Sequence, residues 1–140
     1  MTAHAEPIFL SLCMPTYNFG SFIAETLESI LPQLRPDIEI VIVDGASVDN
    51  TPEIVAKYQQ LAPNICYHRL PRKGGIDHDM KLSIELARGK YCWLFSSDDV
   101  LKEGALEEML SKIREDIDVY LCGFDFPVCD TYERVSLPVR

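Results

Sequence analysis

Apolar residues follow two alternating patterns along this chain. Five short runs, rich in β-branched residues, are apolar enough to be buried on both faces of a sheet. They cover residues 8–14, 38–43, 65–70, 91–95 and 118–122. Between these runs, apolar residues recur at three- and four-residue steps, which is typical of helices that cover a core with one face. Strands alternating with helices predict an α/β fold with a mostly parallel, Rossmann-like sheet flanked by helices.

Four helices are predicted between the strands. The first covers residues 23–34 and ends at an Arg-Pro pair, which a helix does not easily continue through. We interpret Asn18 as its cap. The second begins at the sequence Asn-Thr-Pro-Glu of residues 50–53, where capping side chains precede a proline in the first turn. The third and fourth cover residues 77–87 and 102–115.

The order of these elements predicts where a ligand binds. Crossovers between parallel strands are right-handed, and ligands of such sheets bind outside the carboxyl ends of the strands. The segments that follow the first four predicted strands are rich in polar, acidic and glycine residues. They are residues 15–18, 44–50, 71–75 and 96–99. We therefore expect one site at one edge of the sheet.

Composition narrows the class of partner. The chain has 140 residues, a formal charge of −9 and 47% hydrophobic residues, which is typical of one soluble globular domain. Its Lys and Arg residues are scattered, and this argues against nucleic acid as a partner because phosphate-backbone binding needs a clustered basic face. The purest apolar stretch, residues 40–43, is far shorter than the ~20 residues of a membrane-spanning helix. The sequence therefore predicts no transmembrane segment.

Cysteine usage indicates the compartment. None of the five cysteines is spaced as C-x-x-C, and the first four lie inside apolar runs: Cys13, Cys66, Cys92, Cys122 and Cys129. They are interpreted as reduced thiols, the first four of them buried. The first apolar run lacks the preceding basic residues and the cleavage site of a secretory signal. Together these features predict a cytoplasmic protein.

Three segments, in order, resemble the family-2 glycosyltransferases of the GT-A fold. They are residues 12–18 (LCMPTYN), 42–51 (IVDGASVDNT) and 87–99 (ARGKYCWLFSSDD). Residues 74–80 (GGIDHDM), taken with 91–95 (YCWLF), look most like the abequosyltransferase-like group, which builds bacterial O-antigen and other surface polysaccharides. The resemblance extends over nearly all of residues 8–122.

The resemblance implies an inverting transfer of a sugar from a nucleotide-diphosphate sugar to an acceptor hydroxyl. It implies a donor-binding domain over residues 1–122, with 123–140 as an extended tail or the start of an acceptor-binding half. The family's general base comes from that second half, so we expect it beyond Arg140 and expect little transferase activity from these residues alone. Relatives often act on glycan or lipid-linked acceptors, so a location of this protein at the cytoplasmic surface of the inner membrane is an alternative to a purely cytoplasmic one.

The resemblance assigns nucleotide-sugar contacts to nine residues: Pro15, Thr16, Tyr17, Asp44, Ser47, Asp77, Ser96, Ser97 and Asp98. Asp44 matches the position that hydrogen-bonds the base or ribose, and Gly45 stands where a second Asp is common. Tyr17 suits stacking on the base, and residues 72–73 suit an approach to the diphosphate. Structural alternatives remain open, because Asp44 also suits a turn, Tyr17 a core edge and residues 72–73 a surface loop.

The third predicted helix carries two acids near its start. Asp77 is preferred over Asp79 as the residue near the nucleotide, and the alternative for Asp77 is the N-cap of this helix. Met80, Ile84 and Ala87 share one face of the helix, which we expect to pack on the sheet.

Asp98 and Asp99 are the predicted metal ligands. The resemblance implies Mg²⁺ or Mn²⁺, which takes one or two carboxylates together with substrate phosphate and water. Ser96 stands where the family motif usually has its first Asp, so metal affinity is expected to be lower than with a full D-x-D. The alternative is that both acids only cap the following helix. Ser96 also favours a second hypothesis, a non-catalytic nucleotide-binding or interaction module with the same fold.

Overall fold

The computed structural model describes residues 6–113 and 117. Its elements follow the predicted alternation of strands and helices. In chain order they are β1 (Leu10–Thr16), α1 (Ile23–Ile30), the 3₁₀ helix η1 (Leu31–Gln33), β2 (Ile38–Asp44), α2 (Thr51–Leu61), β3 (Ile65–Arg69), α3 (Ile76–Leu86), β4 (Tyr91–Leu94) and α4 (Ala105–Lys112). The strand predicted at 118–122, and the domain boundary predicted after it, lie outside the described residues.

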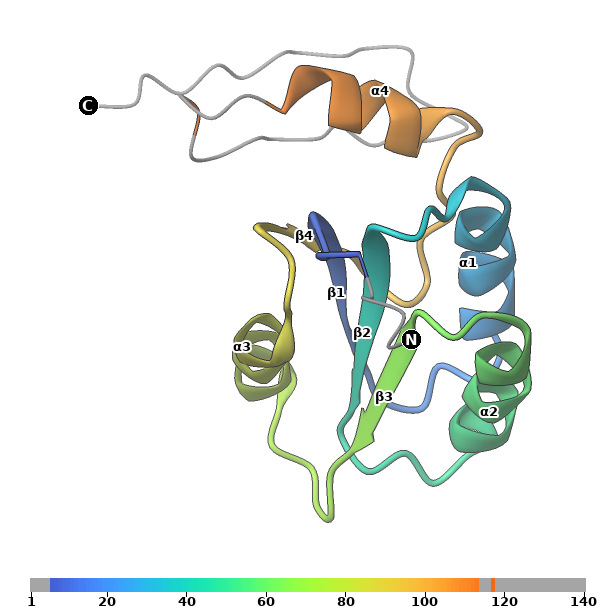
Figure 1. Ribbon diagram of the computed structural model, residues 1–140. Coiled ribbons are helices and arrows are strands. Elements are labelled where there is room, and N and C mark those ends of the chain that lie inside the picture. Colours follow the sequence, from blue (N-terminus) through green and yellow to red (C-terminus); the bar gives the residue numbers. More distant parts are fainter. Residues whose placement is uncertain (1–5, 114–116, 118–140) are drawn as a thin grey trace, which may run out of the picture. The chain divides into compact units, whose positions relative to one another are not determined.

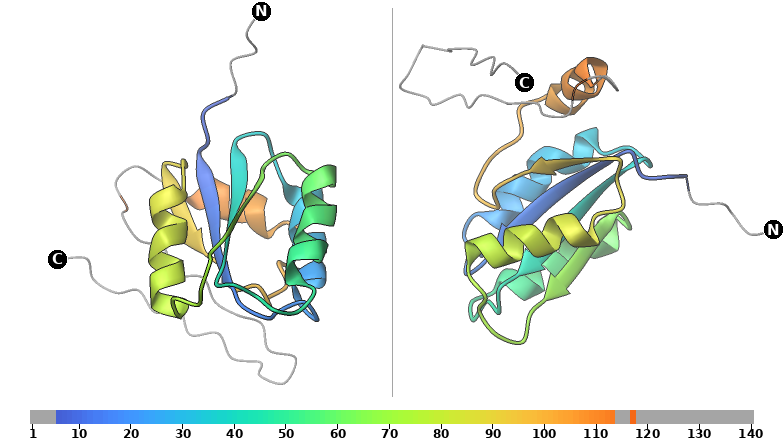
Figure 2. Two further views of the ribbon diagram at one scale, coloured as in Figure 1. Left: turned by 90° about the horizontal axis from the view of Figure 1, so that it is seen from below. Right: turned by 90° about the vertical axis from the view of Figure 1, so that its left-hand side faces the viewer.

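The four strands form one parallel sheet in the order β3-β2-β1-β4. Leu10 of β1 lies opposite both Ile38 of β2 and Tyr91 of β4, so the carboxyl ends of the strands share one edge. α1 and α2 cover one face of the sheet, and α3 covers the other (Figures 1 and 2). The predicted parallel α/β fold is confirmed, and the strand order reverses direction at β1, where β4 joins it.

The core lies between the two central strands and the helices. All seven residues of β1 and all seven of β2 are buried. α1 buries Ile23, Leu27 and Ile30 along one side, at the three- and four-residue spacing seen in the sequence. Each such side chain contributes about 1.5–3 kcal/mol when it leaves water. This burial fixes the two strands whose carboxyl ends carry the candidate site.

The outer strands differ from the prediction that every strand is buried on both faces. β3 and β4 lie at the edges of the described sheet, and only Ile65 of β3 is buried. In β4, Leu94 is 51% exposed and Cys92 is also exposed. The prediction was wrong for these strands because an edge strand has a neighbour on one side only. Of the three free thiols in the described part, Cys13 is buried and Cys66 is half-buried.

The inner face of α3 also differs from the prediction. Its buried residues are Asp79 and Ser83, whereas Ile84, expected on the inner face, is 41% exposed. The thiol of Cys13 on β1 lies 3.6 Å from the carbonyl oxygen of Ser83. The small serine side chain lets the helix backbone approach the strand closely, and a larger residue at this position would hold the two apart.

Two helices are shorter than predicted. α1 ends at Ile30 and the chain continues as the tighter η1, in which proline occupies the first turn. α4 begins at Ala105 rather than at residue 102 because Gly104 before it takes a left-handed φ of 79°, which is not helical.

The chain divides into two compact units, Met1–Leu106 and Glu107–Arg140. The first contains the sheet. In the second, the described residues are 107–113 and 117, and Lys112 forms an ion pair of 2.8 Å with Glu108 one turn earlier. Among all described residues, no helix has both the length and the apolar character needed to cross a membrane.

Candidate functional site

Hydrogen bonds join the loops that follow β1 and β2. The amide of Asn18 donates to Ser47 Oγ at 2.9 Å, and the amide of Val48 donates to Asn18 Oδ1 at 2.8 Å. Asn18 has a φ of 54°, a left-handed conformation that Asn tolerates better than most residues. The prediction that Asn18 caps the first helix was wrong. α1 begins after Phe22, and the Asn18 side chain instead ties the two loops together.

Asp44 ends β2 and is fully buried. Its Oδ1 accepts a hydrogen bond of 2.7 Å from the amide of Ser47, and its Oδ2 accepts one from the hydroxyl of Tyr67. Burial and this contact with a carboxylate raise the pKa of Tyr67, so the phenol stays protonated as the donor. Arg69 donates to the carbonyl oxygen of Ser47 at 2.8 Å. In this conformation Asp44 fixes the turn that carries Ser47.

Asp49 holds the start of α2. Its Oδ1 accepts from the amide and the hydroxyl of Thr51 at 3.0 and 2.6 Å, and its Oδ2 accepts from the amide of Gly20 at 2.9 Å. Burial opposes ionisation, but these hydrogen bonds outweigh it and lower the pKa of Asp49. These contacts of Asp49 also join the first loop to the second. Asn50, which begins the predicted capping segment, makes no side-chain capping hydrogen bond, so the side-chain contacts at the start of α2 come from Asp49 instead.

The end of β1 carries three of the predicted contacts. Pro15 and Thr16 are buried and Tyr17 is half-buried. Nζ of Lys73 lies 4.1 Å from the centre of the Tyr17 ring, a cation–π contact that brings the loop after β3 beside the loop after β1. Oγ1 of Thr16 is buried and, within the described residues, has no hydrogen-bond partner.

The first turn of α3 brings a second buried acid to this edge. Asp77 is exposed, whereas the Asp79 side chain is only 5% exposed and its Oδ1 lies 3.0 Å from Nδ1 of His78. A Cβ built at Gly45 would lie 2.5 Å from Asp79 Oδ2, and one at Gly74 would lie 3.1 Å from Oδ1. The carboxylate therefore sits between the loops that follow β2 and β3.

The loop after β4 presents the predicted metal ligands. The hydroxyl of Ser96 donates to Oδ1 of Asp98. Ser97 is buried, and its carbonyl oxygen accepts a hydrogen bond of 3.0 Å from the hydroxyl of Thr26 on α1. Burial and the neighbouring charge of Asp98 raise the pKa of Asp99. α1 thus anchors the loop that carries the two carboxylates.

The donor set of this loop fits a shared cation better than an all-protein cage. No three His, Cys, Asp or Glu side chains gather as a ready-made cation site anywhere in the described part of the chain. Asp98 is exposed and Asp99 is half-buried. Mg²⁺ and Mn²⁺ are commonly held by one or two carboxylates, with phosphate and water completing the shell. Asp98 and Asp99 suit that arrangement.

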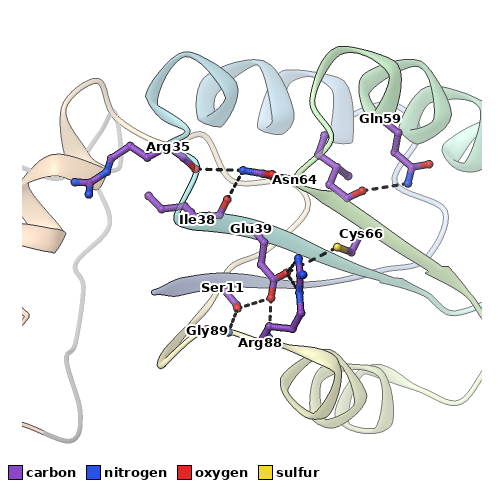
Figure 3. Close-up of polar contacts among 10 residues, drawn as sticks. Ser11, Arg35, Ile38, Glu39, Gln59, Asn64, Cys66, Arg88 and Gly89 are labelled. Carbon is purple, nitrogen blue, oxygen red and sulfur yellow. Dashed lines mark hydrogen bonds and ion pairs between the residues drawn. The ribbon is translucent and has the colours of Figure 1, made fainter. Parts of the chain in front are cut away.

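A different polar cluster, which the sequence analysis did not identify, lies toward the amino ends of the strands (Figure 3). Glu39 of β2 is fully buried, and its Oε1 accepts from the hydroxyl of Ser11 and from the amide of Arg88, each at 2.7 Å. The Arg88 guanidinium contacts Oε2 at 2.8–2.9 Å. The amide of Gly89 donates to Ser11 Oγ at 2.9 Å. These contacts fasten the start of β4 to β1 and β2.

The sequence and the fold both match known glycosyltransferases. The model of the family "Glycosyl transferase family 2" matches residues 11–138. The abequosyltransferase RfbV of Salmonella typhimurium is 36% identical over 129 residues, which are 90% of this chain and 39% of that protein. The glycosyltransferase GlyG of Streptococcus pneumoniae is 33% identical over 116 residues, or 82% of this chain and 38% of that protein.

Solved structures give the same result. S. aureus TarS 1-349, determined in complex with UDP-GlcNAc, matches with a TM-score of 0.69 and 30% identity over 74% of this chain and 30% of that one. The Pyrobaculum calidifontis mannosyltransferase PcManGT, in complex with GDP-Man and Mn²⁺, matches with a TM-score of 0.60 and 26% identity over 65% of this chain and 28% of that one. The chain spans about two-fifths of the length of RfbV and GlyG. It belongs to glycosyl transferase family 2.

Proposed function

We propose that this chain is the donor-binding part of a glycosyltransferase that moves a sugar from a nucleotide-diphosphate sugar to an acceptor hydroxyl during synthesis of a bacterial surface polysaccharide. The observation that carries the proposal is the meeting of four polar loops at the carboxyl edge of a parallel sheet. The names of RfbV and of the UDP-GlcNAc and GDP-Man complexes support the class of donor.

The proposed donor site draws on all four loops. Its residues are Pro15, Thr16, Tyr17, Asp44, Ser47, Asp77, Ser96, Ser97 and Asp98. Asp44 uses one lone pair on each oxygen for Ser47 and Tyr67, and a carboxylate has about four acceptor positions. Its buried position makes it the residue that sets the shape of the loop, while Tyr17 offers a ring face for stacking.

Asp98 and Asp99 are the proposed ligands of a divalent cation. Such a cation, when bound, stabilises the negative charge that develops on the departing nucleoside diphosphate. The hydrogen bond from Ser96 orients one oxygen of Asp98, and Thr26 and Ser29 of α1 hold the loop at Ser97 and Leu101. These contacts preorganise the carboxylates before a ligand arrives. The general base is assigned to residues outside this chain, which covers about two-fifths of the length of RfbV and GlyG.

Nucleotide binding by the 140-residue chain tests the donor-site proposal. Thermal unfolding is followed with UDP, GDP, CDP and dTDP, each with and without Mn²⁺. A ligand at 100 times its Kd adds about 2.7 kcal/mol of stability, so one nucleotide should raise the Tm clearly and more strongly with Mn²⁺. Unchanged Tm values with all four nucleotides would contradict the proposal.

Ser96 favours a second candidate function, a nucleotide-binding module without transferase activity, because the serine at this position adds no carboxylate to Asp98 and Asp99 of the metal loop. The comparison that separates the two candidates uses a version extended at the carboxyl end to the length of RfbV. Sugar transfer by the extended version, with little by the 140-residue chain, supports the enzyme. Nucleotide binding without transfer in both versions supports the module.

A further inference from the structure

Asp79 is buried, yet only one of its two carboxylate oxygens is paired. The residue is 3% exposed, and the one hydrogen-bonding contact of its side chain within the described residues joins Oδ1 to His78. Oδ2 has no partner there, and it keeps contact with solvent, since Thr16 Oγ1 is the one fully buried side-chain oxygen or nitrogen without a partner in the described residues. A carboxylate oxygen that the fold orients but leaves unpaired and accessible can accept a hydrogen bond from a ligand.

The unpaired Oδ2 of Asp79 lies beside Gly45, in the loop that follows β2. A Cβ at Gly45 would lie 2.5 Å from Oδ2, and the Gly45 amide donates to the carbonyl oxygen of Thr16 at 2.9 Å. Thr16 also carries a buried polar atom, Oγ1, that lacks a partner in the described part of the chain. Gly45 therefore lies between Asp79 Oδ2 and the backbone of Thr16 at the carboxyl edge of the sheet.

The glycines explain how this corner of the site is built. A side chain at Gly45 would occupy the space of the Asp79 carboxylate, and a Cβ at Gly74 would lie 2.5 Å from His78 Nδ1. Gly75 has a φ of 93°, which lets the chain enter α3 so that Asp79 faces inward. The Gly45 backbone, which has no side chain, therefore leaves free the space that the Asp79 carboxylate occupies.

We propose that Asp79 determines nucleobase specificity by accepting, through Oδ2, a hydrogen bond from a ring N–H of the donor's base. This rests on the proposed nucleotide-sugar function. A carboxylate accepts and never donates, so it selects bases that present a ring N–H, as uracil, thymine and guanine do, over cytosine, whose ring N3 is an acceptor. Tyr17, at the end of β1 and under Lys73, provides the ring face for the same base.

The test measures Kd by titration calorimetry for UDP, dTDP, GDP and CDP with Mn²⁺, on the full 140-residue chain. The wild type should bind at least one ring-N–H nucleotide more tightly than CDP. Asp79→Asn places a donor NH₂ at the same site and should reduce that preference about tenfold or more, the range expected for one hydrogen bond to a charged group. Glu85→Gln, exposed on the same helix, is the matched control and should leave the preference unchanged.

Two further measurements keep the test decisive if Asp79→Asn is unstable. With the wild-type protein, N-methylation of the ring nitrogen of the preferred nucleotide should weaken binding at least as much as Asp79→Asn is expected to reduce the preference, about tenfold. The double variant Gly45→Asp with Asp79→Ala returns a carboxylate to the corner from β2 and should restore most of the preference. An unchanged preference in Asp79→Asn, or an equal loss for all four nucleotides, would overturn the role of Asp79. Absence of binding by the wild type would overturn the proposed function instead.

Discussion

Glu39 and Asp79 are both buried carboxylates, yet their surroundings are opposite. Glu39, toward the amino ends of the strands, accepts hydrogen bonds from Ser11 and from both the backbone and the guanidinium of Arg88. The side chain of Asp79, at the carboxyl edge, has a hydrogen-bonding contact only with His78 within the described residues. Burial alone therefore does not distinguish a structural acid from a ligand-binding acid. The number of donors already provided by the protein does, because a saturated carboxylate has little left to offer a ligand.

The largest expected effect is the loss of stability on removing Glu39. Glu39→Ala leaves the hydroxyl of Ser11 and the amide of Arg88 without their acceptor, at about 1–3 kcal/mol for each buried group. Because the Arg88 guanidinium is 61% exposed and can turn to water, we expect a total of about 2–4 kcal/mol, measured by urea unfolding. Glu85→Ala, on the exposed side of α3, is the control. If Glu39→Ala and Glu85→Ala unfolded with the same free energy, Glu39 would not be a structural acid and the difference drawn between Glu39 and Asp79 would not hold.

Replacing Asp98, in contrast to Glu39, should change ligand binding and leave stability nearly unchanged. Asp98→Asn keeps the size of an exposed side chain, so the free energy of unfolding should change by less than about 0.5 kcal/mol. Nucleotide affinity in Mn²⁺ should fall about tenfold or more, while affinity in EDTA stays the same, because only the metal-dependent part is lost. Calorimetric titration in both buffers measures this. A loss of the same size in EDTA would contradict metal binding by Asp98.

Two buried hydroxyls, one paired and one unpaired, should differ in their contribution to stability by a smaller amount. Ser11 both donates to Glu39 and accepts from Gly89, so Ser11→Ala should cost about 1–2 kcal/mol. Thr16 Oγ1 has no partner in the described residues, so Thr16→Val should leave stability unchanged or raise it by up to about 1 kcal/mol. Thermal unfolding of the two variants side by side measures the difference. A destabilised Thr16→Val would mean that this hydroxyl has a structural partner.

The smallest expected effect is the pH dependence contributed by Glu39. Burial opposes ionisation, but hydrogen bonds from Arg88 and Ser11 and the Arg88 charge lower the pKa of Glu39 below its ordinary 4.5. The folded protein therefore holds fewer protons at this group than the unfolded chain. The stabilisation is fully present above about pH 4.5 and is lost as the pH falls through the lowered pKa. Glu39→Gln should unfold with a flatter pH dependence below pH 4.5 than the wild type. Identical profiles would contradict this account.

The position of the polar loops at the carboxyl edge of the sheet was predictable because its signals are local. The segments after the strands hold the Asp, Ser and Gly residues that turns and metal sites need, and the resemblance to family 2 singled out Asp44, Ser47, Asp98 and Asp99 among them. Asp79 was passed over for Asp77 because both lie in one helical turn. Which of them faces inward depends on how α3 is rotated against the sheet, and that rotation follows from Ser83 packing on β1.

The sequence by itself determined the alternation of strands and helices and the family, because periodicity and short motifs are carried by neighbouring residues. Only the tertiary structure decided which strands are edges, which face of α3 is buried, and how fully each buried acid is paired. Those features depend on contacts between residues far apart in the chain, such as Glu39 with Arg88 and Asp79 with Gly45. A hydrogen bond across the sheet has no period in the sequence, so the saturated acid and the unsaturated one look alike until the chain is folded.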